Sequence, residues 1–136
     1  MDELCQQLAK LAPALTSDDS WPQIQLQKCG DLGVFEWFLS ANVGGQGWSE
    51  RDVLQGYLRL SEACLTTTFI ITQRTGACKR IGLTQNQPLR ERLLPDLVTG
   101  TSFSTLAISH LTTSRRHLGK PALLAQESPT GFVLNG

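Results

Sequence analysis

The sequence predicts a mainly α-helical fold up to about residue 100, followed by short β-strands. Apolar residues recur at helical spacing over most of the first hundred positions, and glycines stand where those segments end. After Gly100 the apolar residues alternate instead, in segments rich in strand-forming side chains. The chain is therefore expected to be helical first and β afterwards.

The last residues carry a further prediction. Residues 131–134 read as a strand, and Asn135-Gly136 after it is the strongest short hairpin signal. A hairpin turn needs a second strand, and none follows. We therefore expect this chain to be the front part of a larger protein.

Two helices are predicted in the first third of the chain. Residues 2–15 form an amphipathic helix, because leucines recur at helical spacing at Leu4, Leu8, Leu11 and Leu15. After a polar loop, residues 23–32 form a second helix that Gly33 ends. The short apolar segment 34–39 leads into a glycine-rich loop over residues 42–47.

Three more helices are predicted before residue 100. The first begins at Ser49, where Ser49-Glu50-Arg51-Asp52 resembles a capping box with Asp in the usual place of Glu. Its wide apolar face carries Val53, Leu54, Tyr57, Leu58, Leu60 and Cys64. The β-branched residues 66–68 predict a break, and a largely apolar helix runs from about residue 67 to 83. A last helix over residues 88–98 starts at a favourable proline and stops at Gly100.

Three strands are predicted after Gly100, over residues 102–108, 121–126 and 131–134. Residues 127–130 join the last two as a turn. The sequence shows neither repeats nor a low-complexity segment.

Composition limits the classes of function. The chain has 136 residues, 40% of them hydrophobic and 18% charged, as in an ordinary globular protein. Twelve basic and twelve acidic side chains give a formal net charge of zero, which disfavours binding to nucleic acid or to an anionic membrane. No apolar run is long enough to cross a membrane, and the N-terminus lacks the pattern of a signal peptide. A cytoplasmic protein is expected.

The four cysteines do not predict a metal site. Cys5, Cys29, Cys64 and Cys78 are far apart in the sequence, and only two histidines accompany them. Cys64 and Cys78 fall on apolar helix faces. We expect buried, unreactive thiols in a reducing compartment.

Four short motifs occur in an order typical of one family. They are the loop Ser40-Ala41-Asn42-Val43-Gly44-Gly45-Gln46-Gly47, the helix end Leu60-Ser61-Glu62-Ala63-Cys64, the segment Leu93-Leu94-Pro95-Asp96-Leu97-Val98-Thr99-Gly100, and the terminal Gly131-Phe132-Val133-Leu134-Asn135-Gly136. Together they resemble the acyl-CoA dehydrogenase family. In the first loop Ser40 and Asn42 stand where the family has Pro and Glu.

The resemblance implies a fold and a function. Residues 1–100 correspond to the family's N-terminal helical domain, and residues 101–136 to the incomplete beginning of its middle β-barrel domain. It implies the N-terminal part of an FAD-dependent oxidoreductase that acts on an acyl-CoA or a related small molecule, as in fatty acid metabolism. The family's catalytic base lies in a C-terminal helical bundle, so no residue here is nominated as catalytic. A homo-oligomer is implied for the full-length parent, and the fragment alone is expected to be inactive.

The resemblance also implies residues that contact the flavin, although the sequence differs from the family motif in that region. The family has Thr-Glu-Pro-x-x-Gly-Ser-Asp after its first strand, where this chain has Ser109-His110-Leu111-Thr112-Thr113-Ser114-Arg115-Arg116. Ser109 keeps a hydroxyl, so Ser109, its neighbour Ile108 and, after a shift of one residue, Ser114 are expected to contact the flavin. The changed loop leaves room for flavin oxidases or monooxygenases on the same fold.

The expected substrate residues are Thr68, Thr72 and Gln73, which align with the helix that lines the acyl pocket in the family. They could instead bond a neighbouring helix or face water.

Two further features each allow a functional and a structural interpretation. The glycine loop either cradles a phosphate or serves backbone geometry. His110 and the basic cluster Arg115, Arg116, His117 and Lys120 either meet flavin and phosphate or belong to a solvated loop.

Two classes of function remain open from the sequence. One is the front of a flavin-dependent acyl-CoA dehydrogenase-like enzyme, which contributes to the acyl pocket and to one edge of the flavin site. The other is a non-catalytic helical interaction module, or a remnant that retains the fold.

Overall fold

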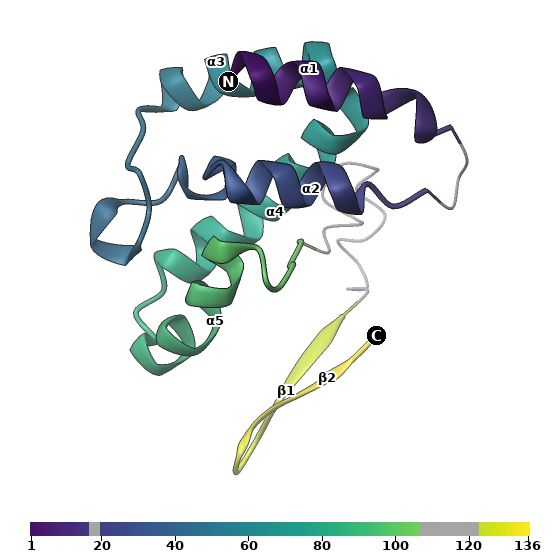
Figure 1. The fold of residues 1–136 in the computed structure, drawn as a ribbon. Helices are drawn as coiled ribbons and strands as arrows, with labels where there is room; N and C mark the ends of the chain where they lie inside the picture. Colours follow the sequence, from purple (N-terminus) through teal and green to yellow (C-terminus); the bar gives the residue numbers. More distant parts are fainter. Residues whose placement is uncertain (17–19, 107–122) are drawn as a thin grey trace. The chain divides into compact units, whose positions relative to one another are not determined.

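The computed structural model describes residues 1–16, 20–106 and 123–136 (Figure 1). It forms two compact units, Met1–Leu106 and Ala107–Gly136. The first unit holds all the described helices, and the described part of the second is a β-hairpin. The chain is thus mainly helical with a short antiparallel sheet near its C-terminus, as predicted.

The first predicted helix is divided in two. Helix α1 (Asp2–Leu11) ends before Pro13, and a 3-10 turn η1 (Ala12–Ala14) follows it. Proline cannot supply the N–H that a continued α-helix needs, which explains the earlier end. Helix α2 (Gln23–Asp31) stops ahead of Gly33, whose left-handed φ of 72° ends the helix as predicted.

The apolar segment that follows forms a 3-10 turn η2 (Val34–Glu36), and the glycine-rich loop contains a second one, η3 (Ala41–Val43). Helix α3 (Glu50–Ala63) begins where predicted. The Ser49 hydroxyl accepts a hydrogen bond from the backbone N–H of Asp52 at 3.2 Å and donates one to the Asp52 carboxylate at 2.6 Å. The Asp therefore completes the cap through the serine hydroxyl, because its side chain is one carbon shorter than that of Glu.

The long apolar helix begins slightly earlier than predicted. Cys64 is in an extended conformation and separates α3 from α4 (Leu65–Gly82), so the break precedes the threonines. Helix α5 (Gln87–Thr99) follows, capped by the Asn86 side chain, which accepts from the N–H of Leu89 at 3.1 Å. Gly100, with φ of 81°, ends it as predicted.

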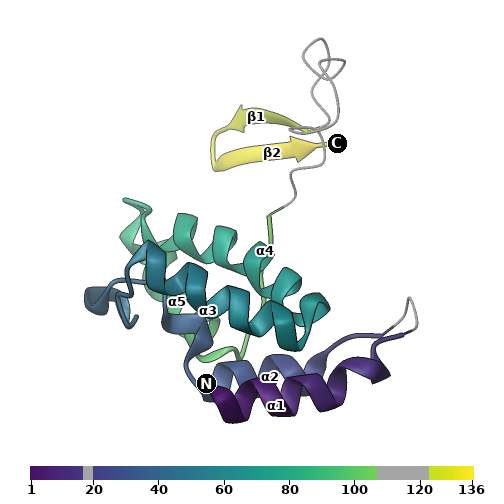
Figure 2. The ribbon, with the colours of Figure 1, turned by 90° about the horizontal axis from the view of Figure 1, so that it is seen from above.

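The helical unit buries one continuous core. Helices α1, α2, α3 and α4, the η2 turn and residues next to them contribute its buried side chains. These side chains are Leu4, Leu8, Leu26, Cys29, Val34, Phe35, Trp37, Leu60, Cys64 and Ile71. Helix α4 packs against both α3 and α5, and Figure 2 shows α1 beside α2. The predicted apolar face of α3 is only partly covered, since Leu54 and Leu58 remain 59% and 62% exposed.

The hairpin of the second unit joins β1 (Leu124–Ser128) to β2 (Gly131–Asn135) in antiparallel register, with Ser128 opposite Gly131. The strand predicted over residues 102–108 is not formed over residues 102–106, and residues 107 and 108 lie outside the described residues. Here the backbone N–H of Ser102 bonds to Asp96, and Phe103 packs on Trp21 instead of on a partner strand. A strand needs such a partner to satisfy its backbone, which the alternating pattern alone does not supply.

Candidate functional site

The glycine-rich loop uses its own backbone donors internally. The N–H groups of Gly44, Gly45, Gln46, Gly47 and Trp48 all donate to backbone carbonyls, at 2.7 to 3.2 Å. A phosphate cradle needs such N–H groups to point at the ligand. This loop therefore offers no fit to the diphosphate of FAD, and its glycines serve backbone geometry.

One glycine of this loop has no room for a side chain. A Cβ on Gly45 would lie 2.0 Å from the carbonyl oxygen of Leu39, which is backbone and cannot turn away. Gly44 is needed for its φ of 84°, but its Cβ would meet nothing within 4 Å. The loop thereby places Trp48 against Trp37, with ring centroids 4.5 Å apart and planes nearly parallel.

Two of the three residues predicted to contact substrate bond to their own helix. The Thr68 hydroxyl donates to the carbonyl of Cys64 at 3.0 Å, and this side chain is buried inside the helical unit. The Thr72 hydroxyl donates to the carbonyl of Phe69 at 2.7 Å from a half-buried position. Gln73 is exposed, and no hydrogen bond joins it to another described residue.

The exposed face of α4 that carries Gln73 is unusually apolar. Leu65 and Phe69 lie two turns and one turn before Gln73 and are 69% and 63% exposed. Further along, Gly76 faces the side chain of Leu106, whose Cδ1 would lie 2.9 Å from an added Cβ. The chain therefore brings Gln73 together with an apolar helix stripe and half-buried Thr72, while Thr68 belongs to the interior.

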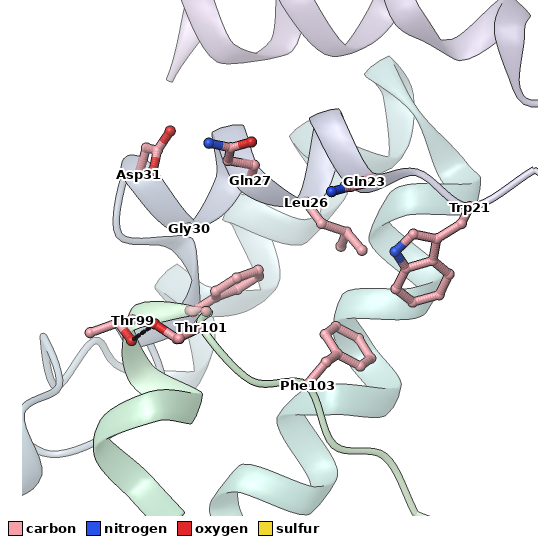
Figure 3. A pocket seen from close by; sticks show the side chains of 11 residues that line it. Trp21, Gln23, Leu26, Gln27, Gly30, Asp31, Thr99, Thr101 and Phe103 are labelled. Atoms are coloured by element: carbon pink, nitrogen blue, oxygen red, sulfur yellow. Dashed lines mark hydrogen bonds between the residues drawn. The ribbon is translucent and has the colours of Figure 1, made fainter.

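A separate pocket, which the sequence did not indicate, lies between α2 and the end of α5 (Figure 3). Its volume is about 380 Å³. Trp21 and Phe103 meet edge to face at one end, with centroids 5.5 Å apart. At the other end the hydroxyls of Thr99 and Thr101 bond to each other at 2.9 Å.

The floor of this pocket is the ring of Phe35, and an arginine covers that ring. Cβ atoms on Gly30 and Gly100 would lie 3.1 and 2.8 Å from the ring edge, so the ring leaves room for no side chain at Gly100 and little at Gly30. The guanidinium carbon of Arg74 lies 3.9 Å from the ring centroid, a cation–π contact.

Arg74 is the least expected residue of the helical unit. It is 0% exposed, and none of its three guanidinium nitrogens has a hydrogen-bond partner. Burial lowers its pKa, while the neighbouring Cys78 and Tyr57 oppose that shift. The only sequence signal was a charge within the apolar stretch of α4, which by itself also fits an exposed position.

The buried thiols are also grouped. Cys29 is fully buried, and burial raises the pKa of its thiol from 9.0 to about 12, with further contributions from Cys64 and Cys5. All four cysteines are free, and Cys29, Cys64 and Cys78 are buried as predicted. Within the described ranges, no cluster of His, Cys, Asp and Glu could hold a metal ion.

The residues predicted to contact the flavin, Ile108, Ser109 and Ser114, lie outside the described residues, as do His110 and the basic cluster 115–120. The structure thus leaves that prediction untested. Within the described chain, no helix is both long and apolar enough to cross a membrane.

Comparison with known proteins identifies the helical unit. The four motifs predicted a helical domain that ends at Gly100 and is followed in the sequence by β-strands. The structure has helices up to Thr99 and a β-hairpin over residues 124–135. Residues 2–101 match the family model for the acyl-CoA dehydrogenase N-terminal domain, and the chain belongs to this family.

Two solved structures share the fold. The prolyl acyl carrier protein oxidase AnaB aligns over 99% of this chain with a TM-score of 0.73 and 22% identity. An FAD-dependent dehydrogenase aligns equally well, with a TM-score of 0.73 and 25% identity. The chain spans 38% and 36% of their lengths. None of the curated proteins compared with the chain matches it.

Proposed function

We propose that this chain is the N-terminal part of a flavin-dependent oxidoreductase that oxidises an acyl thioester. The observation that carries the proposal is the match of residues 2–101 to the acyl-CoA dehydrogenase N-terminal domain. The FAD-dependent neighbour supports the choice of cofactor, and the carrier protein oxidase extends the substrate class to acyl groups on a carrier.

In this proposal α4 forms one wall of the acyl pocket. Its exposed stripe of Leu65 and Phe69 is suited to an alkyl or ring substituent, because burying apolar surface there would be favourable. Gln73 and Thr72 supply polar contacts at the same face. Thr68, whose hydroxyl is bonded to Cys64, acts as a positioning residue beneath them.

The flavin contacts are assigned to Ile108, Ser109 and Ser114. When bound, FAD would accept the hydride removed from the substrate. The glycine-rich loop provides no phosphate cradle, so we derive no step through the cofactor. The proposal also includes a homo-oligomer and a cytosolic location, the latter supported by four unpaired thiols.

Substitution of Gln73 in the proposed full-length enzyme, of which this chain would be the N-terminal part, tests the role of α4. Gln73→Ala should raise KM about threefold to tenfold and leave kcat nearly unchanged, because a single hydrogen bond to bound substrate is lost. Gln6→Ala, which removes the same exposed amide from α1, is the matched control. Equal KM values for both variants and the parent would exclude this pocket wall. A protein that never binds flavin would favour the non-catalytic interaction module.

A further inference from the structure

The formal net charge of zero hides an uneven distribution along the helical unit. Residues 1–63 carry four basic and nine acidic side chains, whereas residues 64–106 carry five basic and two acidic ones. The second group falls on α4 and α5. The first part of the unit's sequence is therefore acidic on balance, and the part that forms α4 and α5 is basic.

Four of those basic residues lie in the helix turns at one end of the α4–α5 pair. Lys79 and Arg80 are in the last turn of α4, and Arg90 and Arg92 are in the first two turns of α5. The residues that join the helices, 83–86, hold these turns at the same end (Figure 1). We call these four residues and Leu83 the basic end.

The side chains of the basic end are available to a partner. Lys79, Arg80 and Arg92 are exposed and Arg90 is half-buried. The one ion pair among the described residues joins Asp2 to Arg59, so the four cations are not neutralised within the unit. Two carboxylates lie near these cations. Glu91 stands between Arg90 and Arg92 in the sequence and accepts a hydrogen bond from Gln87 at 2.6 Å. Glu50 lines the same surface cavity as Lys79.

Helix stability explains only half of this arrangement. Cations at the C-terminal end of α4 interact favourably with the helix dipole, which accounts for Lys79 and Arg80. Arg90 closes the first turn of α5, where the same dipole disfavours a cation and where no acidic residue is present. A role in binding accounts for the cations of both helices.

The geometry favours a protein over a nucleotide. Lys79 lines one surface cavity and Arg90 lines a different one, so these cations do not converge as a phosphate site requires. Leu83, 82% exposed, lies in the short segment that joins the two helices that carry them. An exposed apolar residue with charges around it is typical of a protein–protein contact.

We propose that the basic end docks an acidic protein that carries the acyl substrate as a thioester, as an acyl carrier protein does. This inference rests on the proposed function and names the carrier of its substrate. The cations would speed and orient the encounter, and Leu83 would supply the apolar contact. The affinity should fall with added salt, because the contacts are exposed.

The test is a binding titration of the 136-residue chain with an acidic acyl carrier protein at low salt, followed by calorimetry or NMR. The double variant Lys79→Glu, Arg80→Glu should weaken binding about tenfold, because two attractive contacts become repulsive. The matched double variant Lys10→Glu, Lys28→Glu changes the same charge on α1 and α2 and should weaken it less than about twofold. Leu83→Ser should weaken binding without changing its salt dependence.

Three results would overturn the inference. They are absence of binding, equal weakening by both double variants, and binding of free coenzyme A at the basic end in place of the protein. The readout is independent of the flavin reaction. If the longer protein oxidises acyl-CoA while the carrier protein does not dock, this inference fails and the proposed function stands.

Discussion

At the scale of single residues, close backbone contacts decide which glycines of the 44–47 loop matter. Gly45 lies against the Leu39 carbonyl, whereas Gly44 has open space but a positive φ. The two positions therefore separate steric contact from backbone strain within one loop.

Substitution by alanine should distinguish them. Gly44→Ala is expected to cost about 1 kcal/mol, because alanine must adopt a left-handed conformation. Gly45→Ala should cost about 3 kcal/mol or more, because its Cβ would collide with backbone that cannot move aside. Urea unfolding of both variants measures the difference, and equal losses would contradict the loop geometry.

A second residue-scale prediction concerns Cys29 and pH. Its pKa is raised from 9.0 to about 12, so the folded state keeps a proton that the unfolded state releases. The stabilisation is complete below pH 9 and is lost as pH rises from there toward 12. Between pH 8 and pH 10 the parent should lose about 1.4 kcal/mol through this thiol.

Cys29→Ala provides the control. This variant has a lower stability at pH 8 because of the cavity, but its further loss between pH 8 and pH 10 should be smaller by that amount. Chemical denaturation at both pH values gives the comparison. The same pH dependence in parent and variant would mean that Cys29 titrates normally in the folded chain.

At the scale of elements, the sequence predicted the ends of helices, which depend on neighbouring residues. It did not predict contacts between segments that are distant in the sequence. The cap at Ser49 and the stops at Gly33 and Gly100 depend on a few neighbouring residues, so the sequence predicted them. The prediction of a strand over 102–108 was wrong for residues 102–106, because strand pairing depends on a partner that is distant in the sequence. The burial of Arg74 depends on Phe35, which lies 39 positions earlier in the chain and could not be placed against it by pattern alone.

The caps themselves should contribute measurably. Ser49→Ala and Asn86→Ala each remove a side chain that accepts from a backbone N–H in the first turn of α3 or α5. Each should reduce the free energy of unfolding by about 1 kcal/mol. Ser61→Ala removes a hydroxyl that only bonds back to Tyr57 within α3, so it should be nearly neutral. Similar losses for all three would show that the caps carry no special role.

At the scale of the whole molecule, the two units differ in how much they bury. The helical unit has a continuous core, whereas the hairpin leaves Phe132, Val133 and Leu134 at least 50% exposed. A two-stranded sheet without a covering layer is marginal in water. The candidate site divides in the same way, since the face of α4 proposed to contact substrate is described while the predicted flavin contacts are not.

Hydrogen exchange should reveal this difference. Amides of α3 and α4 around Leu60 and Ile71 should exchange slowly, because opening them disrupts the core. Amides of Gln126 and Val133 in the hairpin should exchange quickly. Equal protection in both units would mean that the hairpin is stabilised by contacts that its exposure does not reveal.

The central claim is that this chain is one part of a flavoenzyme's site, and bound flavin measures it most directly. The 136-residue chain, mixed with FAD and dialysed, should retain much less than one flavin per chain, because most contacts to the cofactor are missing. The longer protein should retain about one, and an acyl thioester added without oxygen should bleach its visible absorbance. Stoichiometric flavin on the short chain, or a longer protein that binds none, would contradict the account.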